Sequence, residues 1–155
     1  MVTFIGEHTC KLDAKGRVIF PATFKKQVTG DNRERYVVKT DIYEKCLVLY
    51  PNDEWERQVK IIRKKINPYS KEHNMFLRRF FKGVAEVNLD ANNRLLLPKR
   101  LLDEIGADKD LILAGQFGKI EIWAKERYER IELSDEQYAG MAEDIFEGLV
   151  DETEE

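Results

Sequence analysis

The chain has 155 residues, of which 43% are hydrophobic and 35% are charged, a composition typical of a folded globular protein. It contains no apolar run long enough for a membrane span, and its first residues lack the features of a signal peptide, so we expect a cytoplasmic location. The net charge of −3 divides into −10 for residues 132–155 and +7 for the rest, and a basic body is compatible with a polyanionic partner, although a solvated charged surface explains the same charge.

The first predicted elements lie between about residue 4 and residue 60, in the order strand, tight turn, strand, short helix, two strands and a helix. In the turn, Gly16 stands just before Arg17 and readily adopts the positive φ that a hairpin turn needs. Asp13 can accept backbone N–H groups across the same turn. Pro21 suits the first position of the short helix, where its missing N–H costs nothing.

The segment from Asn52 to Phe81 is predicted to form two helices. Asn52 can cap the first helix, Asn67-Pro68 interrupts it, and Ser70 can cap the second. Between Lys60 and Lys82 the segment holds eight Lys or Arg and one acidic residue. This basic stretch is either a surface that follows phosphates or the solvated side of the helices, and we favour the solvated side for its first half.

The same order of elements returns in residues 81–131. The segment from Leu12 to Pro21 is repeated 77 residues later as the segment from Leu89 to Pro98. In the repeated turn Asn93 replaces Gly16, and these two residue types most readily accept positive φ. The turn aspartate and the proline that begins the short helix also match, and the strand residues Tyr36-Val37-Val38 match Leu111-Ile112-Leu113. The second short helix can end at Gly106.

We therefore predict four parts: a first repeat at 4–60, a helical linker at 61–80, a second repeat at 81–131, and an acidic C-terminal helix and tail at 132–155. In the last part, Ser134 and Gln137 form a capping box. An apolar stripe at helical spacing follows it and comprises Tyr138, Met141, Ala142, Ile145, Phe146 and Leu149. The pattern predicts an amphipathic helix.

Four short motifs carry a family resemblance that extends over nearly the whole chain. They are Phe4-Ile5-Gly6, Asp13-Ala14-Lys15-Gly16-Arg17, Arg78-Arg79-Phe80-Phe81 and Asp90-Ala91-Asn92-Asn93-Arg94, and together they strongly resemble the MraZ family. The resemblance implies an α+β fold: a tandem-repeat, swapped-hairpin β-barrel of the AbrB type, with short helices in each half and a C-terminal amphipathic helix. It also implies a nucleoid-associated transcriptional regulator of the division and cell-wall gene cluster. Such a regulator binds direct repeats in double-stranded DNA near its own promoter as a ring-shaped homo-oligomer.

By this resemblance, Lys15, Arg17 and Arg94 are the leading DNA contacts. Arg pairs bidentately with guanine, and Asn92 and Asn93 can read adenine edges. Three residues support the turns, namely Asp13, Gly16 and Asp90, and two are candidates for a subunit boundary, namely Arg78 and Arg79. The second motif has asparagine where the family has glycine and no lysine that matches Lys15, so we expect the two turns to contribute unequally.

The alternative for Arg17 and Arg94 is that they only pair with the turn aspartates and hold the hairpins in shape. Exposed ion pairs contribute little to stability, so the repetition of both arginines favours a function.

Other function classes receive less support from the residues. The only histidines are His8 and His73, and His8 with Cys10 on one strand face does not make a closed zinc site. We expect no catalytic residue, metal, cofactor, small-molecule substrate or membrane partner. Two alternatives are a structural ring protein that works through its C-terminal helix and the antidote of a toxin–antitoxin pair. The doubled motif and the patterned tail argue against the antidote.

Overall fold

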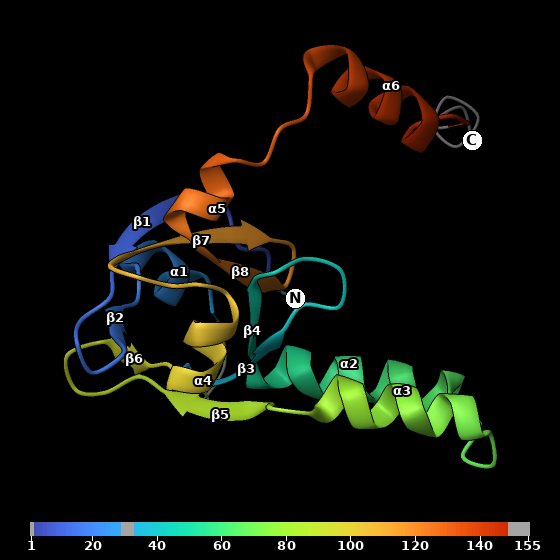
Figure 1. Ribbon diagram of the computed structural model, residues 1–155, viewed down its shortest axis with the longest axis horizontal. Helices are drawn as coiled ribbons and strands as arrows, with labels where there is room; N and C mark the ends of the chain where they lie inside the picture. Colours follow the sequence, from blue (N-terminus) through green and yellow to red (C-terminus); the bar gives the residue numbers. More distant parts are fainter. Residues whose placement is uncertain (1, 29–32, 149–155) are drawn as a thin grey trace.

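The sheet topology of this chain brings strands from the two sequence repeats together. The computed structural model describes residues 2–28 and 33–148, and it contains a six-stranded and a two-stranded antiparallel sheet (Figure 1). The larger sheet has the order β1 (Glu7–Lys11), β7 (Asp110–Gln116), β8 (Lys119–Ala124), β4 (Leu47–Pro51), β3 (Arg35–Thr40) and β5 (Ala85–Asn88). The smaller sheet, here called the ribbon, pairs β2 (Arg17–Ile19) with β6 (Arg94–Leu96).

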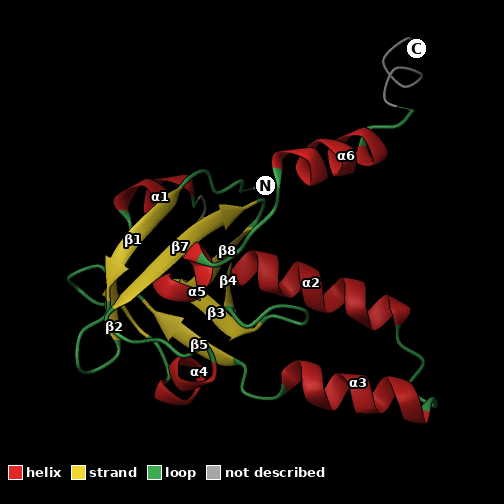
Figure 2. Ribbon diagram, turned by 45° about the horizontal axis from the view of Figure 1, so that its top comes forward, coloured by secondary structure: helices red, strands yellow, loops and turns green. Residues whose placement is uncertain are grey.

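The helices follow the strands in the order that the sequence predicts for each repeat. Short helices come after the ribbon strands and after β8, and longer ones project from the body: α1 (Ala22–Gln27), α2 (Asn52–Lys65), α3 (Lys71–Phe81), α4 (Lys99–Glu104), α5 (Lys125–Glu129) and α6 (Asp135–Ile145). Figure 2 shows α2 and α3 as an antiparallel hairpin that extends from one end of the body. Of the helices described, none combines the length and the apolar character needed to cross a membrane.

Each repeat completes its sheet with strands of the other repeat. Strand β1 pairs with β7, with His8 opposite Leu113, and β5 pairs with β3, with Ala85 opposite Val38. These two pairs occupy matching positions of the two copies, and Val18 and Leu95, which also match, lie opposite each other in the ribbon. The registers are therefore related by an internal two-fold axis, and the hairpin strands are exchanged between the repeats.

One hydrophobic core serves both repeats. It contains matching pairs of fully buried side chains from the ribbon and from the residues that follow it, among them Val18 with Leu95 and Phe20 with Leu97. In the ribbon strands only the middle residue is buried, as the two-residue period of a strand requires. Since the same cluster also includes the central strands of both copies, neither repeat has a separate core of its own.

The two turns adopt the left-handed conformation and are fastened to the opposite repeat. Gly16 has a φ of 87° and Asn93 a φ of 58°. The backbone N–H of Leu97 donates to the Gly16 carbonyl at 2.9 Å, and the N–H of Phe20 donates to the Asn93 carbonyl at 2.9 Å. A Cβ on Gly16 would lie 3.0 Å from the Leu97 carbonyl oxygen, so a side chain at this position requires that carbonyl to shift by a few tenths of an ångström.

Three of the predicted helix ends are confirmed. The Ser70 hydroxyl accepts a hydrogen bond from the His73 backbone N–H at 3.2 Å, and Ser134 and Gln137 form both bonds of the capping box. Gly106 ends α4 with a φ of 67°, and the following N–H reaches back to the carbonyl of Leu102. This arrangement is a Schellman cap, which satisfies two carbonyls at the helix end.

For three helices the prediction assigns the first residue or the N-cap one position away from where the structure has it. Pro21 and Pro98 have ψ angles of 130° and 131°, which are extended, so they are the N-cap residues and not the first helical residues. Asn52 is likewise not a cap: Pro51 holds that position, and the Asn52 side chain donates to Glu56. Proline fixes only φ, and the same φ serves both the N-cap and the first turn.

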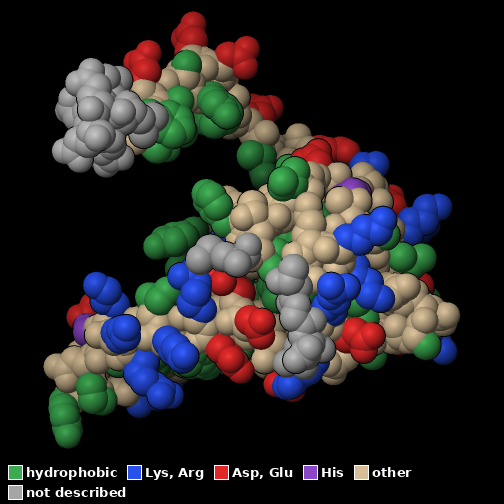
Figure 3. Space-filling model, turned by 180° about the vertical axis from the view of Figure 1, so that it is seen from behind, with side chains coloured by type: hydrophobic (Ala, Val, Ile, Leu, Met, Phe, Trp, Pro, Cys, Tyr) green, Lys and Arg blue, Asp and Glu red, His purple; other side chains and the backbone are tan. Residues whose placement is uncertain are grey.

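The C-terminal helix α6 stands away from the body (Figure 1). Its apolar stripe is exposed. Tyr138, Met141, Ile145 and Phe146 are all at least half exposed. The last residue of the predicted stripe, Leu149, lies outside the described residues. Figure 3 shows acidic side chains on this helix and basic side chains on the α2–α3 hairpin, so the charge asymmetry of the sequence is also an asymmetry in space.

We predict that Gly16→Ala lowers the free energy of unfolding by about 1–2 kcal/mol, because a Cβ is strained at this φ and meets the Leu97 carbonyl. The matched change Asn93→Gly should cost less than about 1 kcal/mol, since glycine accepts the same φ. Urea unfolding of both variants measures the difference. A larger loss for Asn93→Gly than for Gly16→Ala would contradict the prediction.

Candidate nucleic-acid interface

The two turns protrude together at the end of the body opposite the α2–α3 hairpin (Figures 1 and 2). The ribbon joins them, and its middle residues point into the core. The flanking positions therefore face outward: Arg17 lies opposite Leu96, and Ile19 lies opposite Arg94. Ile19 is 65% exposed and Leu96 is 56% exposed, so the outer face of the ribbon carries two arginines on one diagonal and two aliphatic side chains on the other.

Each turn is organised by one aspartate. Asp13 Oδ1 accepts the backbone N–H groups of Lys15 at 3.0 Å and Arg17 at 2.8 Å, and its Oδ2 accepts Arg17 Nε–H at 2.7 Å. Asp90 repeats this pattern with the N–H groups of Asn92 at 2.8 Å and Arg94 at 2.9 Å and with Arg94 Nε–H at 2.9 Å. One carboxylate thus holds the backbone of the turn and the guanidinium at its end.

The same bonds leave the outer part of each guanidinium free. Arg17 and Arg94 use Nε for the aspartate, and within residues 2–28 and 33–148 neither Nη1 nor Nη2 has a hydrogen-bond partner. Their side chains are 30% and 28% exposed, so both are partly accessible to solvent. A planar group fixed through Nε presents its two terminal nitrogens in the fork that recognises guanine or phosphate.

Hydrogen bonding also keeps the turn aspartates ionised. The backbone N–H of Arg17 is the largest cause that lowers the pKa of Asp13, and the Arg17 guanidinium adds to it. The backbone N–H of Arg94 does the same for Asp90. Because these pKa values are lowered, the pairs contribute fully above the ordinary pKa of aspartate and are lost only as the pH falls through the lowered value.

The other predicted contact residues differ in whether their side chains are already bound within the protein. Lys15 and Asn92 are exposed at the tips of their turns. The side-chain oxygen of Asn93, in contrast, accepts a hydrogen bond from Lys25 Nζ of α1. Lys25 therefore brings a cation to the second turn. No sequence pattern indicates this contact, because it joins residues of different repeats.

The remaining candidates lie elsewhere. Arg78 and Arg79 are exposed on α3, away from the turns (Figure 2). Over the residues described, no group of three His, Cys, Asp or Glu side chains lies close enough to hold a metal ion. His8 packs edge-to-face on Phe24 with a centroid distance of 4.9 Å, and its Nε2 is buried without a partner.

Comparison with known proteins identifies the family. The model of a family described as "MraZ protein, putative antitoxin-like" matches the chain twice, over residues 3–79 and 80–145. The chain belongs to the MraZ family. The resemblance that the turn motifs indicate is thereby confirmed, and one match falls on each half of the chain, as expected for an MraZ protein with two copies of one unit.

Similar MraZ proteins come from several bacteria and bear the name "Transcriptional regulator MraZ". One from Christiangramia forsetii is 38% identical over 146 residues, which are 94% of each chain. One from Bacteroides thetaiotaomicron is 38% identical and covers 94% of this chain and 93% of its own. One from Flavobacterium psychrophilum is 38% identical over 98% of this chain and 97% of its own.

We predict that Arg17→Ala leaves the pKa of Asp13 below that of an ordinary aspartate, because the largest cause is the backbone N–H, which alanine keeps. The loss of the guanidinium should raise that pKa only part of the way. Carbon-13 NMR titration of the carboxyl groups measures both values, with Asp90 as the unchanged internal control. A full return of Asp13 to the pKa of about 3.9 of a free aspartate would show that the side chain dominates.

Proposed function

We propose that this chain is a sequence-specific DNA-binding transcriptional regulator, and that the ribbon with its two turns is the surface that contacts the DNA. The observation that carries the proposal is the pair of guanidinium groups that are fixed by aspartates and free at their outer nitrogens. The name of the relatives, transcriptional regulator, supports the same function.

The chemistry of the ribbon suits the major groove. A two-stranded β-ribbon fits into that groove, where an arginine can donate two hydrogen bonds to O6 and N7 of guanine. Lys15 at the tip of the first turn is placed to neutralise a phosphate, and Asn92 can donate to and accept from an adenine. Ile19 and Leu96, which are exposed between the arginines, offer apolar contacts to thymine methyl groups. A ribbon of this composition can read bases and hold the backbone at once.

The finer features of the family extend this proposal. The exchanged hairpin strands support a swapped-hairpin barrel of the AbrB type, in which the two halves of one chain take the place of two subunits. We propose that the regulator acts in the cytoplasm at the nucleoid, without catalytic activity, on the division and cell-wall gene cluster. It binds direct repeats in its own promoter region as a ring, and Arg78 and Arg79 are candidates for the ring contacts.

The two turns are expected to contribute unequally. Their Asp–Arg pairs have nearly the same geometry, so the difference comes from the neighbouring positions. The first turn has Lys15, a cation, at the position where the second has Asn92, and the Asn93 amide is already engaged by Lys25. Each turn thus has one lysine beside its arginine, but Lys15 is exposed at the tip of the first turn, whereas Lys25 is half-buried and donates to Asn93 at the second. We therefore expect the first turn to contribute more to DNA binding.

We predict that Arg17→Ala abolishes specific binding to the DNA upstream of its own gene, and that Arg94→Ala weakens it less. A bidentate arginine–guanine pair contributes about 1–3 kcal/mol of discrimination, so each loss is measurable by fluorescence anisotropy. Arg17→Lys is the matched control, because it keeps the charge and loses the fork; it should retain non-specific binding only.

The controls for this experiment distinguish a DNA-contacting role of the arginines from a role in stabilising the turns. Both variants should melt within a few degrees of the parent protein, because the Asp13 backbone bonds remain. Equal losses of binding from the two alanine changes would contradict the asymmetry. Unfolding of Arg17→Ala would show that the pair only holds the turn in shape.

We further predict that binding depends on several DNA repeats on one face of the helix. Lys15, Arg17 and Arg94 neutralise at most three phosphates, which gives a salt slope of about −2.7 per protomer and hence weak binding alone. In a ring the further contacts become intramolecular, and the affinity rises by roughly 10² to 10⁴.

The measurement compares DNA with one repeat, with three repeats at about 10 bp spacing, and with about 5 bp inserted to turn one repeat to the opposite face. We expect tight binding only for the second DNA. If one repeat binds as tightly as three, or if the insertion has no effect, a monomer or dimer suffices and the ring plays no part in recognition.

A further inference from the structure

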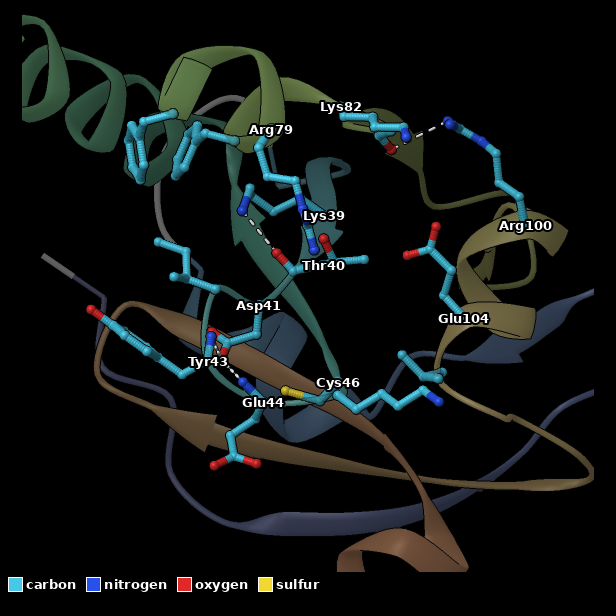
Figure 4. A pocket seen from close by; sticks show the side chains of 16 residues that line it. Lys39, Thr40, Asp41, Tyr43, Glu44, Cys46, Arg79, Lys82, Arg100 and Glu104 are labelled. Carbon is cyan, nitrogen blue, oxygen red and sulfur yellow. Dashed lines mark hydrogen bonds between the residues drawn. The ribbon is translucent and has the colours of Figure 1, made fainter. Parts of the chain in front are cut away.

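A cavity of about 830 Å³ opens on the body between the C-terminal end of α3, the loop that joins β3 to β4, and α4. Its volume lies in the range of about 300–1,000 Å³ that is usual for small-ligand sites. Figure 4 shows polar side chains from all three elements around it. The proposed DNA contacts Lys15, Arg17 and Arg94 do not line it.

Positive charge dominates the wall of this cavity. Five cationic side chains line it, namely Lys39, Lys45, Arg79, Lys82 and Arg100, against three carboxylates, namely Asp41, Glu44 and Glu104. In the described part of the chain none of the five cations has a carboxylate oxygen within 4.0 Å. Asp41 instead accepts the backbone N–H groups of Tyr43 and Glu44. The cavity therefore has five cations without a direct ion pair among the described residues, although the nearby charge of Asp41 favours the charged form of Lys39.

Lys39 is the most unusual of these cations, because its side chain is only 3% exposed. Its Nζ donates to the Thr40 carbonyl at 2.8 Å and lies 4.2 Å from the centre of the Phe80 ring. An ammonium group has three donors, and these contacts use one of them and one cation–π interaction. Burial lowers the pKa of Lys39, as expected for a cation whose lost hydration is only partly replaced.

The other repeat shows that the fold does not require this lysine. Val38 matches Leu113, so the position of Lys39 corresponds to that of Ala114. Both residues follow a buried residue in matching central strands, β3 and β7. The strand accepts a small apolar side chain in the second copy, which has no counterpart of α3, so Lys39 meets a demand that is specific to the first copy. Its contact with the Phe80 ring is one such demand. An anionic ligand in the cavity would be another.

The cavity also has apolar surface beside its cations. Phe76 is 41% exposed, Ile42 is 55% exposed and Tyr43 is 88% exposed, and all three line the cavity. Two of them are aromatic and offer a flat face. In Figure 4 the Arg79 side chain reaches from α3 toward the strand that carries Lys39, whereas Arg100 lies apart from them on α4. A ligand that fills the cavity therefore needs both a negative charge and a flat apolar part.

We propose that this cavity binds a small phosphorylated ligand with a flat ring, of the nucleotide class, with Lys39 and Lys82 on the phosphates and Phe76 and Tyr43 along the ring. The ligand is bound and not transformed. The proposal does not depend on DNA binding, because it concerns residues that the proposed DNA surface does not use.

The experiment is calorimetric titration of the full chain with adenosine triphosphate, pyrophosphate and adenosine. We expect saturable binding of the triphosphate at one site per chain, and weaker binding of the other two probes, which test the phosphates and the ring separately. Lys39→Met keeps the length of the side chain and removes its charge, so it should weaken triphosphate binding about tenfold or more. Lys64→Met, an exposed position on α2, is the matched control and should bind as the parent does.

The melting temperature of the Lys39→Met variant distinguishes a ligand-binding role of Lys39 from a structural role. Replacing an uncompensated buried charge by an apolar side chain should leave the melting temperature unchanged or raise it. If Lys39→Met unfolds, Lys82→Gln at the exposed end of α3 tests the same cavity and should also weaken binding. The variant with Arg17→Ala and Arg94→Ala together should retain the triphosphate.

Four results would overturn the proposal: no saturable binding, equal affinity in the parent and in the cavity variants, loss of binding in the Arg17 and Arg94 variant, or tighter binding of pyrophosphate than of the triphosphate. A change in the mass of the assembly for Lys39→Met, measured by light scattering with unchanged triphosphate affinity, would mark the cavity as a protein contact instead. It would overturn the proposal as well.

Discussion

Two reciprocal backbone hydrogen bonds tie each turn of this structure to the opposite repeat. The carbonyl of Gly16 accepts from Leu97, and the carbonyl of Asn93 accepts from Phe20, so each turn is completed by the strand that leaves the other turn. This exchange requires a left-handed residue in both turns and brings the two ribbon strands into register. It also makes the core common to both repeats, because the middle residue of each ribbon strand is buried against the other.

The exchange explains why the two candidate arginines act from one surface. They are 77 positions apart in the chain, yet the register places each of them on the outer face, opposite an aliphatic residue of the partner strand. Each turn aspartate makes two kinds of contact through its two carboxylate oxygens. One carboxylate oxygen holds the backbone and the other orients the guanidinium, so a structural role of the pair and a binding role of the arginine are both served by the same contact.

The sequence predicts those features that depend on local chemistry. Three such features reflect a backbone constraint within a few residues: asparagine in place of glycine in the second turn, the serine caps, and the glycine after α4. The order of the elements follows from the sequence repeat. Contacts between the repeats are different. The hydrogen bond from Lys25 to Asn93 joins residues 68 positions apart, and the cation-lined cavity combines three elements from both halves, so no local pattern signals either.

Positions at which the two repeats carry different residues show which side chains the shared fold tolerates there. The shared aspartates hold the backbone of the two turns, and the shared ribbon residues Val18 and Leu95 are buried in the common core. Lys15 against Asn92, and Lys39 against Ala114, are positions where one copy shows that the fold accepts a neutral side chain. A lysine at such a position adds charge that the shared fold does not require, and at Lys39 the charge is buried as well. The cost of burying a cation is the same in either repeat. In the first repeat the Phe80 ring of α3, which the second repeat lacks, offsets part of that cost, and the ligand proposed above would offset the rest on only one side of the internal two-fold axis.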